Sequence, residues 1–237
     1  MAGNGWEESA GAWIADMGER GDYGREFVLD APMMARIEGR GFETALDVGC
    51  GEGRFCRMLQ GLGVRTVGVD PTEALIRRAR ERDPASDYRL GRAEALDFSD
   101  GHFGLVVSYL TLMDITDVGR AIAEMARVLK PGGTLLIANL TSFSTARRPD
   151  EFTPENEADF RFSIDHYLEE RDEWVSWRGI NIRNWHRPLG IYMSLLLDQG
   201  LVLTHFAEPA PQGGDPATAA RYRRVPYFLM MEWRKPA

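Results

Sequence analysis

The sequence has few of the features that mark exported, membrane-bound or metal-binding proteins. It contains two cysteines and four histidines in 237 residues, and it has no apolar run of the roughly 18 residues that a membrane span needs. Cys50 and Cys56 fit neither a disulfide framework nor a zinc motif, so we expect both to pack as small residues and expect no metal site. The first six residues lack the basic and apolar regions of a signal peptide. We therefore expect a cytoplasmic protein that does not bind membranes.

The sequence is also short of positive charge. It has 28 Lys and Arg against 36 Asp and Glu, which gives a net charge of −8 at pH 7. Proteins that bind nucleic acid usually present a basic face to the phosphates, so we expect a small-molecule partner and no nucleic acid. The length and the apolar content of 44% suit one domain over residues 1–237. The oligomeric state is left open.

A glycine-rich turn is the most informative feature of the chain. A short apolar strand leads into glycines at alternate positions, Gly49, Gly51 and Gly53, and residues without a Cβ let a ligand approach the backbone. The helix expected over 52–62 begins with N–H groups that favour an anionic group. The next apolar run ends in Asp70, where a carboxylate can accept hydrogen bonds from both hydroxyls of a ribose. The pattern predicts a pocket for a nucleoside with an anionic tail.

The glycine spacing argues against a dinucleotide. Dinucleotide folds read G-x-G-x-x-G, whereas this turn reads G-x-G-x-G, with Asp47 two residues before the first glycine. Together with segments 91–98 and 103–108 and the Leu-Lys-Pro-Gly-Gly turn at 129–133, it resembles the class I S-adenosylmethionine-dependent methyltransferases that act on small molecules. The resemblance implies a Rossmann-like α/β fold with a seven-stranded, mostly parallel sheet and an antiparallel last strand. It also implies S-adenosylmethionine as the cofactor.

The apolar pattern predicts alternating strands and helices in the first two thirds of the chain. We expect strands at 44–49, 65–70, 87–91, 103–109 and 134–140, and helices at 52–62, 72–82 and 117–129. This order indicates right-handed βαβ units and a parallel sheet. Thr72 and Asp117 are the predicted helix N-caps. At Lys130 a helix is expected to end, because Pro131 cannot continue it.

The remaining segments are expected to surround this core. We predict a helical cover over 1–40, the cofactor-binding core over 41–140, a substrate lid over 142–186, and a helix with a pair of strands over 187–237. The lid is charged and aromatic and shows no strand pattern. In the last segment we expect a helix over 188–199, strands at 201–206 and 225–234, and a loop over 208–224.

The resemblance places the cofactor contacts at the carboxyl ends of the strands, where ligands of open α/β sheets bind. The implied contacts are Asp47, Gly49, Cys50, Gly51, Gly53, Asp70, Pro71, Ala93, Glu94, Ser108 and Tyr109. Methyl transfer from a sulfonium is a direct displacement, so the protein has to align the acceptor, exclude water and accept a proton where the acceptor is a hydroxyl or an amine.

Two residues are candidates for the proton acceptor. Many small-molecule methyltransferases carry a histidine near the position of Asp114, and this chain departs from that pattern. Asp114 could act as the base, bind an acceptor amine, or cap the following helix with Asp117. His186 precedes the predicted helix 188–199 and could accept a proton near neutral pH. It could equally be structural, with its ring hydrogen-bonded to the backbone.

Aromatic residues of the predicted lid are candidates for acceptor binding. Trp174, Trp177 and Trp185 could line an apolar pocket or form a cage for a cationic amine, and Tyr23 could reach over the site from the N-terminal cover. The alternative is that they only bury the segment against the sheet. Trp13 could also reach over the cofactor from the N-terminal cover, although a core position is favoured for it.

These features predict an enzyme that transfers a methyl group from S-adenosylmethionine to a small molecule. Oxygen is favoured over nitrogen as the acceptor because a histidine base is available. Two alternatives remain: a non-catalytic methyltransferase-like protein that binds the cofactor, and an NAD-dependent oxidoreductase. The oxidoreductase would need G-x-G-x-x-G and a second nucleotide-binding half, and neither is visible in the sequence.

Overall fold

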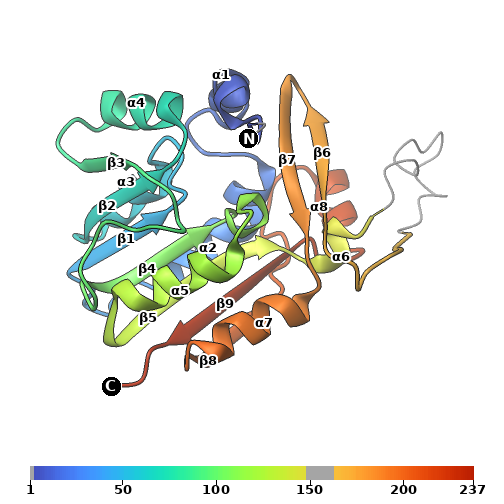
Figure 1. Ribbon diagram of the computed structural model, residues 1–237. Coiled ribbons are helices and arrows are strands. Elements are labelled where there is room, and N and C mark those ends of the chain that lie inside the picture. Colours follow the sequence, from blue (N-terminus) through green and yellow to red (C-terminus); the bar gives the residue numbers. More distant parts are fainter. Residues whose placement is uncertain (1–2, 148–162) are drawn as a thin grey trace.

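The central feature of the computed structural model, which describes residues 3–147 and 163–237, is a sheet in the order β3-β2-β1-β4-β5-β9-β8 (Figure 1). Its strands are β1 (Thr44–Val48), β2 (Arg65–Asp70), β3 (Asp87–Leu90), β4 (Phe103–Tyr109), β5 (Leu129–Leu140), β8 (Val202–Ala207) and β9 (Phe228–Arg234). Neighbours from β3 to β5 are parallel, and β9 runs antiparallel to both β5 and β8. The predicted fold class is confirmed, including the antiparallel last strand.

Helices connect the strands and cover both faces of the sheet. They are α1 (Trp6–Met17), the π-helix η1 (Arg25–Leu29), α2 (Asp30–Ala35), α3 (Arg54–Gly61), α4 (Glu73–Arg82), the 3₁₀ turn η2 (Leu112–Asp114), α5 (Val118–Val128), α6 (Ser142–Thr145), α7 (Leu189–Asp198) and α8 (Pro216–Tyr222). In Figure 1, α1 lies between α4 and a separate hairpin of two strands. None of the helices within the described residues is long and apolar enough to cross a membrane.

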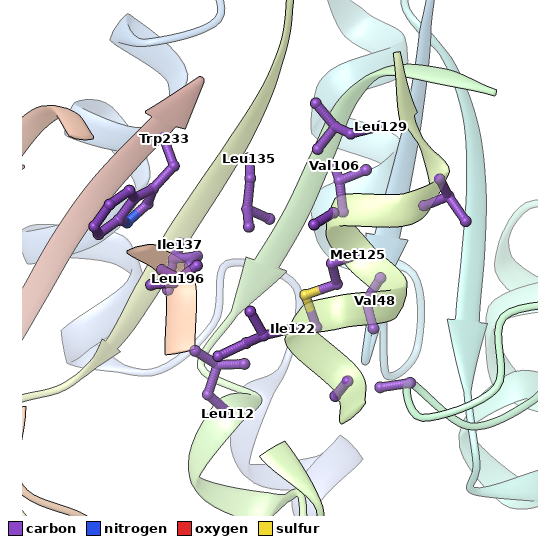
Figure 2. Packing of buried hydrophobic residues seen from close by; sticks show 14 of the residues in the cluster. Val48, Val106, Leu112, Ile122, Met125, Leu129, Leu135, Ile137, Leu196 and Trp233 are labelled. Carbon is purple, nitrogen blue, oxygen red and sulfur yellow. The ribbon is translucent and has the colours of Figure 1, made fainter. Parts of the chain in front are cut away.

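Alternate residues of the central strands pack into two different hydrophobic clusters. On β4, Val106 packs in the cluster that contains Ile122 of α5, whereas Leu105 and Val107 pack in the cluster that contains Leu59 of α3. Figure 2 shows the first cluster, in which side chains of β4, β5 and β9 meet α5 and α7. A parallel sheet covered on both faces explains why its strands read as continuous apolar runs in the sequence.

The expectation that 142–186 contains no strand is wrong. Two strands, β6 (Arg171–Trp177) and β7 (Ile180–His186), form an antiparallel hairpin apart from the main sheet, while 148–162 lie outside the described residues. The strands carry charged residues and are largely exposed or half-buried, so they give no apolar run. Their two-residue turn, Arg178-Gly179, has positive φ at both positions, which is the geometry of a tight hairpin.

Two further boundaries differ from the expectation. β5 starts at Leu129 rather than at 134, and the Lys-Pro-Gly-Gly segment lies within the strand as an irregularity, where the register with β4 shifts and Gly132 has a φ of +74°. Its partner there is remote in sequence: Gly132 donates to the carbonyl of Lys235, and Lys235 donates to the carbonyl of Gly133. Within the expected loop 208–224, α8 forms with Asp215 as its N-cap.

The cluster in Figure 2 gives a direct test of packing on α7. Leu196 is 0% exposed in that cluster, whereas its neighbour Leu197 is 56% exposed. Leu196→Ala should lower the free energy of unfolding by about 2–5 kcal/mol, because it leaves a cavity in the core. Leu197→Ala should change it by less than about 0.5 kcal/mol. Urea denaturation of both variants checks this, and equal effects would contradict the assigned packing.

Candidate active site

A cavity of about 690 Å³ lies at the carboxyl ends of β1, β2 and β4, and α1 and β7 contribute its outer wall. This is the position at which open α/β sheets bind ligands. Nine of the predicted cofactor residues line it: Asp47, Gly49, Cys50, Gly51, Asp70, Pro71, Ala93, Glu94 and Tyr109. Gly53 and Ser108 do not. Gly53 is the N-cap of α3 beside Tyr88, and Ser108 is fully buried in β4.

The glycine turn is built so that backbone, rather than side chain, faces the cavity. Gly49 and Gly51 have φ of +77° and +55°, a region that favours glycine. A Cβ on Gly49 would lie 2.2 Å from a side-chain carbon of Thr111, and one on Gly51 would lie 3.3 Å from the ring of Trp13. The sequence requirement for glycine is therefore explained at both positions.

Asp70 joins the ends of the first two strands. One carboxylate oxygen accepts from the N–H of Gly51 at 3.0 Å, and the other accepts from the N–H of Thr72 at 2.8 Å. The side chain of Thr72 makes no capping bond to α4, so the predicted cap is not formed; the N–H of Ala74 in the first turn donates to Glu7 instead. Burial raises the pKa of Asp70, and these backbone bonds lower it in part. Each carboxylate oxygen can accept further hydrogen bonds on the cavity side.

Asp47 is a buried acid with no ion-pair partner in the described residues. One carboxylate oxygen accepts from the Cys56 thiol at 3.5 Å, and the other has no hydrogen-bond partner. Burial raises the pKa of Asp47 to about 7, assisted by the charge of Asp70. A buried acid with an open acceptor position on a cavity fits a cationic ligand group.

The N-terminal helix covers the cavity and is bonded to both sides of it. Glu7 accepts from the N–H of Ala74 at the start of α4. On the other side, Ser9 exchanges two hydrogen bonds with the backbone of Asn181 in β7. Trp6 and Trp13 of this helix both line the cavity, with their rings edge to face at 5.9 Å.

Arg25 is a cation on the cavity wall that the sequence reading did not select. Its guanidinium lies 5.7 Å from the ring of Trp13 and 5.9 Å from the ring of Tyr109, and it pairs with Asp22 at the surface. Tyr109 donates at 2.7 Å to Asp30, and Asp30 also pairs with Arg54, so the cover is fastened to the sheet.

Asp114 is the catalytic candidate that the structure brings into the cavity. It ends η2, directly after β4, and accepts hydrogen bonds from Trp6 of the cover and Asn184 of β7. Burial raises its pKa to about 8, and the charge of Asp70 adds to the shift. The nearby Arg25 and the two hydrogen bonds act in the opposite direction. Asp117 does cap α5, accepting from the N–H of Arg120.

His186 is not among the residues that line the cavity. Its Nδ1 lies 2.7 Å from the Thr145 hydroxyl and its Nε2 lies 2.9 Å from the carbonyl of Tyr167. Burial lowers its pKa. With both ring nitrogens engaged by the protein, the geometry favours the structural alternative for this residue over a role as base.

Of the four predicted acceptor-binding aromatics, Trp185 alone lines the cavity. Trp174 and Trp177 lie on β6 and are 53% and 38% exposed. Tyr23 donates to the carbonyl of Gly213 and packs against Phe27. Trp6 and Trp13 complete the aromatic wall, so the favoured core position of Trp13 is wrong and Trp6 is an addition that the expected lid in 142–186 did not include.

Comparisons with known proteins agree with the fold. Residues 46–137 match the family model described as a methyltransferase domain. A malonyl-[acyl-carrier protein] O-methyltransferase of Serratia marcescens is 33% identical over 128 residues, covering 52% of this chain and 50% of that protein. A ubiquinone biosynthesis O-methyltransferase of Bradyrhizobium sp. (strain ORS 278) is 37% identical over 120 residues, covering 49% and 46%. The chain thus spans about half the length of these curated relatives.

A solved structure covers more of the chain. An S-adenosylmethionine-dependent methyltransferase from Mesorhizobium loti superposes with a TM-score of 0.76 at 25% identity, covering 92% of this chain and 100% of that one. Residues 46–137 are thus a methyltransferase domain, and the chain has the fold of the class I S-adenosylmethionine-dependent methyltransferases, as its glycine turn predicts. Within residues 3–147 and 163–237, no group of three His, Cys, Asp or Glu is arranged to hold a metal ion.

Asp47 gives a prediction for stability against pH. Its pKa of about 7 in the folded protein lies above the ordinary 3.8, so the folded state keeps a proton that the unfolded state releases. The free energy of unfolding should therefore fall as pH rises from about 4 to 7, by about 1.4 kcal/mol for each unit of pKa difference. Asp47→Asn removes this contribution, so its stability relative to the native protein should rise over that range.

Urea denaturation at pH 5 and pH 8 without cofactor measures the difference. Asp198→Asn, an exposed change on α7, serves as the control and should leave the pH dependence as it is. A stability difference for Asp47→Asn that is the same at both pH values would contradict the assignment.

Proposed function

We propose that this protein transfers the methyl group of S-adenosylmethionine to an oxygen atom of a small molecule. The observation that carries the proposal is the convergence of the glycine turn, Asp70 and Asp114 on one cavity at the carboxyl edge of the sheet. The names of the curated relatives, which are O-methyltransferases, support oxygen as the acceptor atom. The net charge of −8 favours a small-molecule acceptor over nucleic acid.

The residues present fit this cofactor. Asp70 would accept hydrogen bonds from the ribose hydroxyls, and the open oxygen of Asp47 would face the amino group of the methionine part. Gly49 and Gly51 line the cavity and would lie along the methionine part of the cofactor. Arg25 offers a guanidinium for the carboxylate. When bound, the cofactor supplies a methyl group on a positively charged sulfur with a good leaving group.

Asp114 would accept the proton from the acceptor hydroxyl. It stands at the end of β4 on the cavity wall, where Trp6 and Asn184 fix its orientation. Transfer of the hydroxyl proton to its carboxylate leaves the acceptor oxygen with the electron pair that forms the new C–O bond. Trp6, Trp13 and Trp185 would exclude water and hold an acceptor with a flat or apolar body.

The alternative of a non-catalytic protein that only binds the cofactor makes a different prediction. Calorimetry with S-adenosylhomocysteine and with NAD, followed by a screen of hydroxyl, phenol, carboxylate and amine compounds for transfer of a labelled methyl group, separates the alternatives. Cofactor binding with transfer to no acceptor would favour the non-catalytic protein. Binding of NAD without a response to S-adenosylhomocysteine would exclude both forms of the proposal.

Asp70→Asn should weaken cofactor binding while leaving the fold intact. The loss of a charge-assisted hydrogen bond costs about 1.5–3 kcal/mol, which is roughly a tenfold to hundredfold rise in the dissociation constant. Asp87→Asn on the exposed strand β3 is the control, because Asp87 pairs with Arg89 away from the cavity. Calorimetric titration with S-adenosylhomocysteine measures both, and an unchanged constant for Asp70→Asn would place the pocket elsewhere.

Asp114→Asn should reduce kcat by roughly 10²–10⁴ with little change in cofactor affinity, as expected for loss of a general base. A base has to be ionised, and the pKa of Asp114 is raised to about 8, so kcat/KM of the native enzyme should rise with pH and level off above about 8.

His186→Gln tests the competing assignment of the base to His186. If that variant loses turnover while Asp114→Asn keeps it, the base is His186. If neither variant changes turnover, the enzyme works by positioning alone.

A further inference from the structure

Arg187 follows His186 at the end of β7, and its side chain is almost fully buried although it carries a charge. Its guanidinium donates to three backbone carbonyls of the turn after β4: Leu112 at 3.3 Å, Ile115 at 2.9 Å and Thr116 at 3.0 Å. Its Nε lies 3.3 Å from a carboxylate oxygen of Glu170. Burying an arginine is costly unless its donors are used. Here the two Nη groups donate to one turn, and Nε makes the ion pair with Glu170 but no hydrogen bond.

The turn that Arg187 holds is the one that carries Asp114. The 3₁₀ turn η2 has three residues, so the carbonyls at and beyond its end lack partners within the turn. Arg187 supplies donors on both sides of Asp114 in sequence. A planar guanidinium can span several carbonyls at once, which a lysine ammonium cannot do in the same geometry.

The same guanidinium also contacts the aromatic wall. It lies 4.6 Å from the ring centre of Trp185, the lid tryptophan that lines the cavity. The preceding residue, Asn184, donates to Asp114 itself. Three residues at the end of β7 therefore have related contacts. Asn184 donates to Asp114, Trp185 lines the cavity, and Arg187, one residue beyond the strand, holds the turn that carries Asp114.

We propose that Arg187 is a positioning residue for methyl transfer, which fixes the turn bearing Asp114 against the ring of Trp185. It touches neither the cavity nor the reacting atoms and acts through these two neighbours. The expected effect of Arg187 on turnover rests on the proposed function. Its effect on the environment of Asp114 can be measured without an acceptor. The other groups around Asp114 are Trp6 of α1, Arg25 of η1, Asp70 of β2 and Asn184 of β7.

The test uses Arg187→Lys, which keeps the positive charge but loses the planar guanidinium that donates to several carbonyls at once. The matched control is Arg80→Lys. Arg80 donates two hydrogen bonds to the carbonyl of Tyr88, and neither residue lines the cavity. The carboxyl of Asp114 is followed by ¹³C NMR in protein with labelled aspartate and assigned with Asp114→Asn. Binding of S-adenosylhomocysteine and the far-UV circular dichroism spectrum are measured in parallel.

In Arg187→Lys we expect the titration midpoint of Asp114 to fall by about one pH unit or more, because a loosened turn admits water to the carboxylate. With an acceptor found in the screen, kcat should fall roughly 10-fold to 100-fold, as for a small misplacement of reacting groups. Affinity for S-adenosylhomocysteine should be retained, and Arg80→Lys should behave as the native protein in all of these measurements.

Should Arg187→Lys fail to fold, Trp185→Leu tests the same arrangement from the other side. It removes the ring on which the guanidinium lies, and we expect a shifted Asp114 midpoint and a raised KM for the acceptor. An unchanged Asp114 titration with unchanged kcat in a folded variant would overturn the proposal, as would equal changes in Arg80→Lys. Failure of the proposed function would look different: the native protein would bind the cofactor and methylate nothing, while the NMR result would still be readable.

Discussion

The cavity depends on acidic side chains that are buried with no ion-pair partner among residues 3–147 and 163–237. Asp47, Asp70 and Asp114 lie around one space, all three have raised pKa values, and burial is the largest cause in each case. Such carboxylates cost free energy when they ionise in the free protein. A ligand with a positive charge removes part of this cost. The arrangement therefore selects for a cation, and the sulfonium and amino group of S-adenosylmethionine meet that requirement.

Much of the fold could be predicted because its information is local. The strands β1, β2 and β4 are apolar runs, and Gly49 and Gly51 are at positions where the backbone has positive φ. The position of Asp70 at the end of β2 follows from the strand pattern. Asp117 is a cap whose partner lies three residues away. In each case the physical cause is contained within a short stretch of sequence.

The parts that the sequence did not predict depend on partners far along the chain. The extension of β5 to Leu129 is paired with Lys235, and the hairpin β6–β7 is half-exposed and has no apolar run. His186 looked like a base because of its residue type, but its surroundings come from Thr145 and Tyr167. Arg25 was not predicted, because nothing local in the sequence indicates that its guanidinium lies near two aromatic rings of the cavity.

The hydrogen bonds between Ser9 and Asn181 join positions 172 residues apart. A chain that closes so long a loop gains few contacts until the intervening sheet exists, so this wall of the cavity is expected to assemble after the strands that it covers. Contacts between such distant segments are expected to open locally while β4 and β5 stay folded. Fast amide exchange in α1 and β7, against slow exchange in the central strands, would be the signature of a site that can admit its ligand without unfolding the protein.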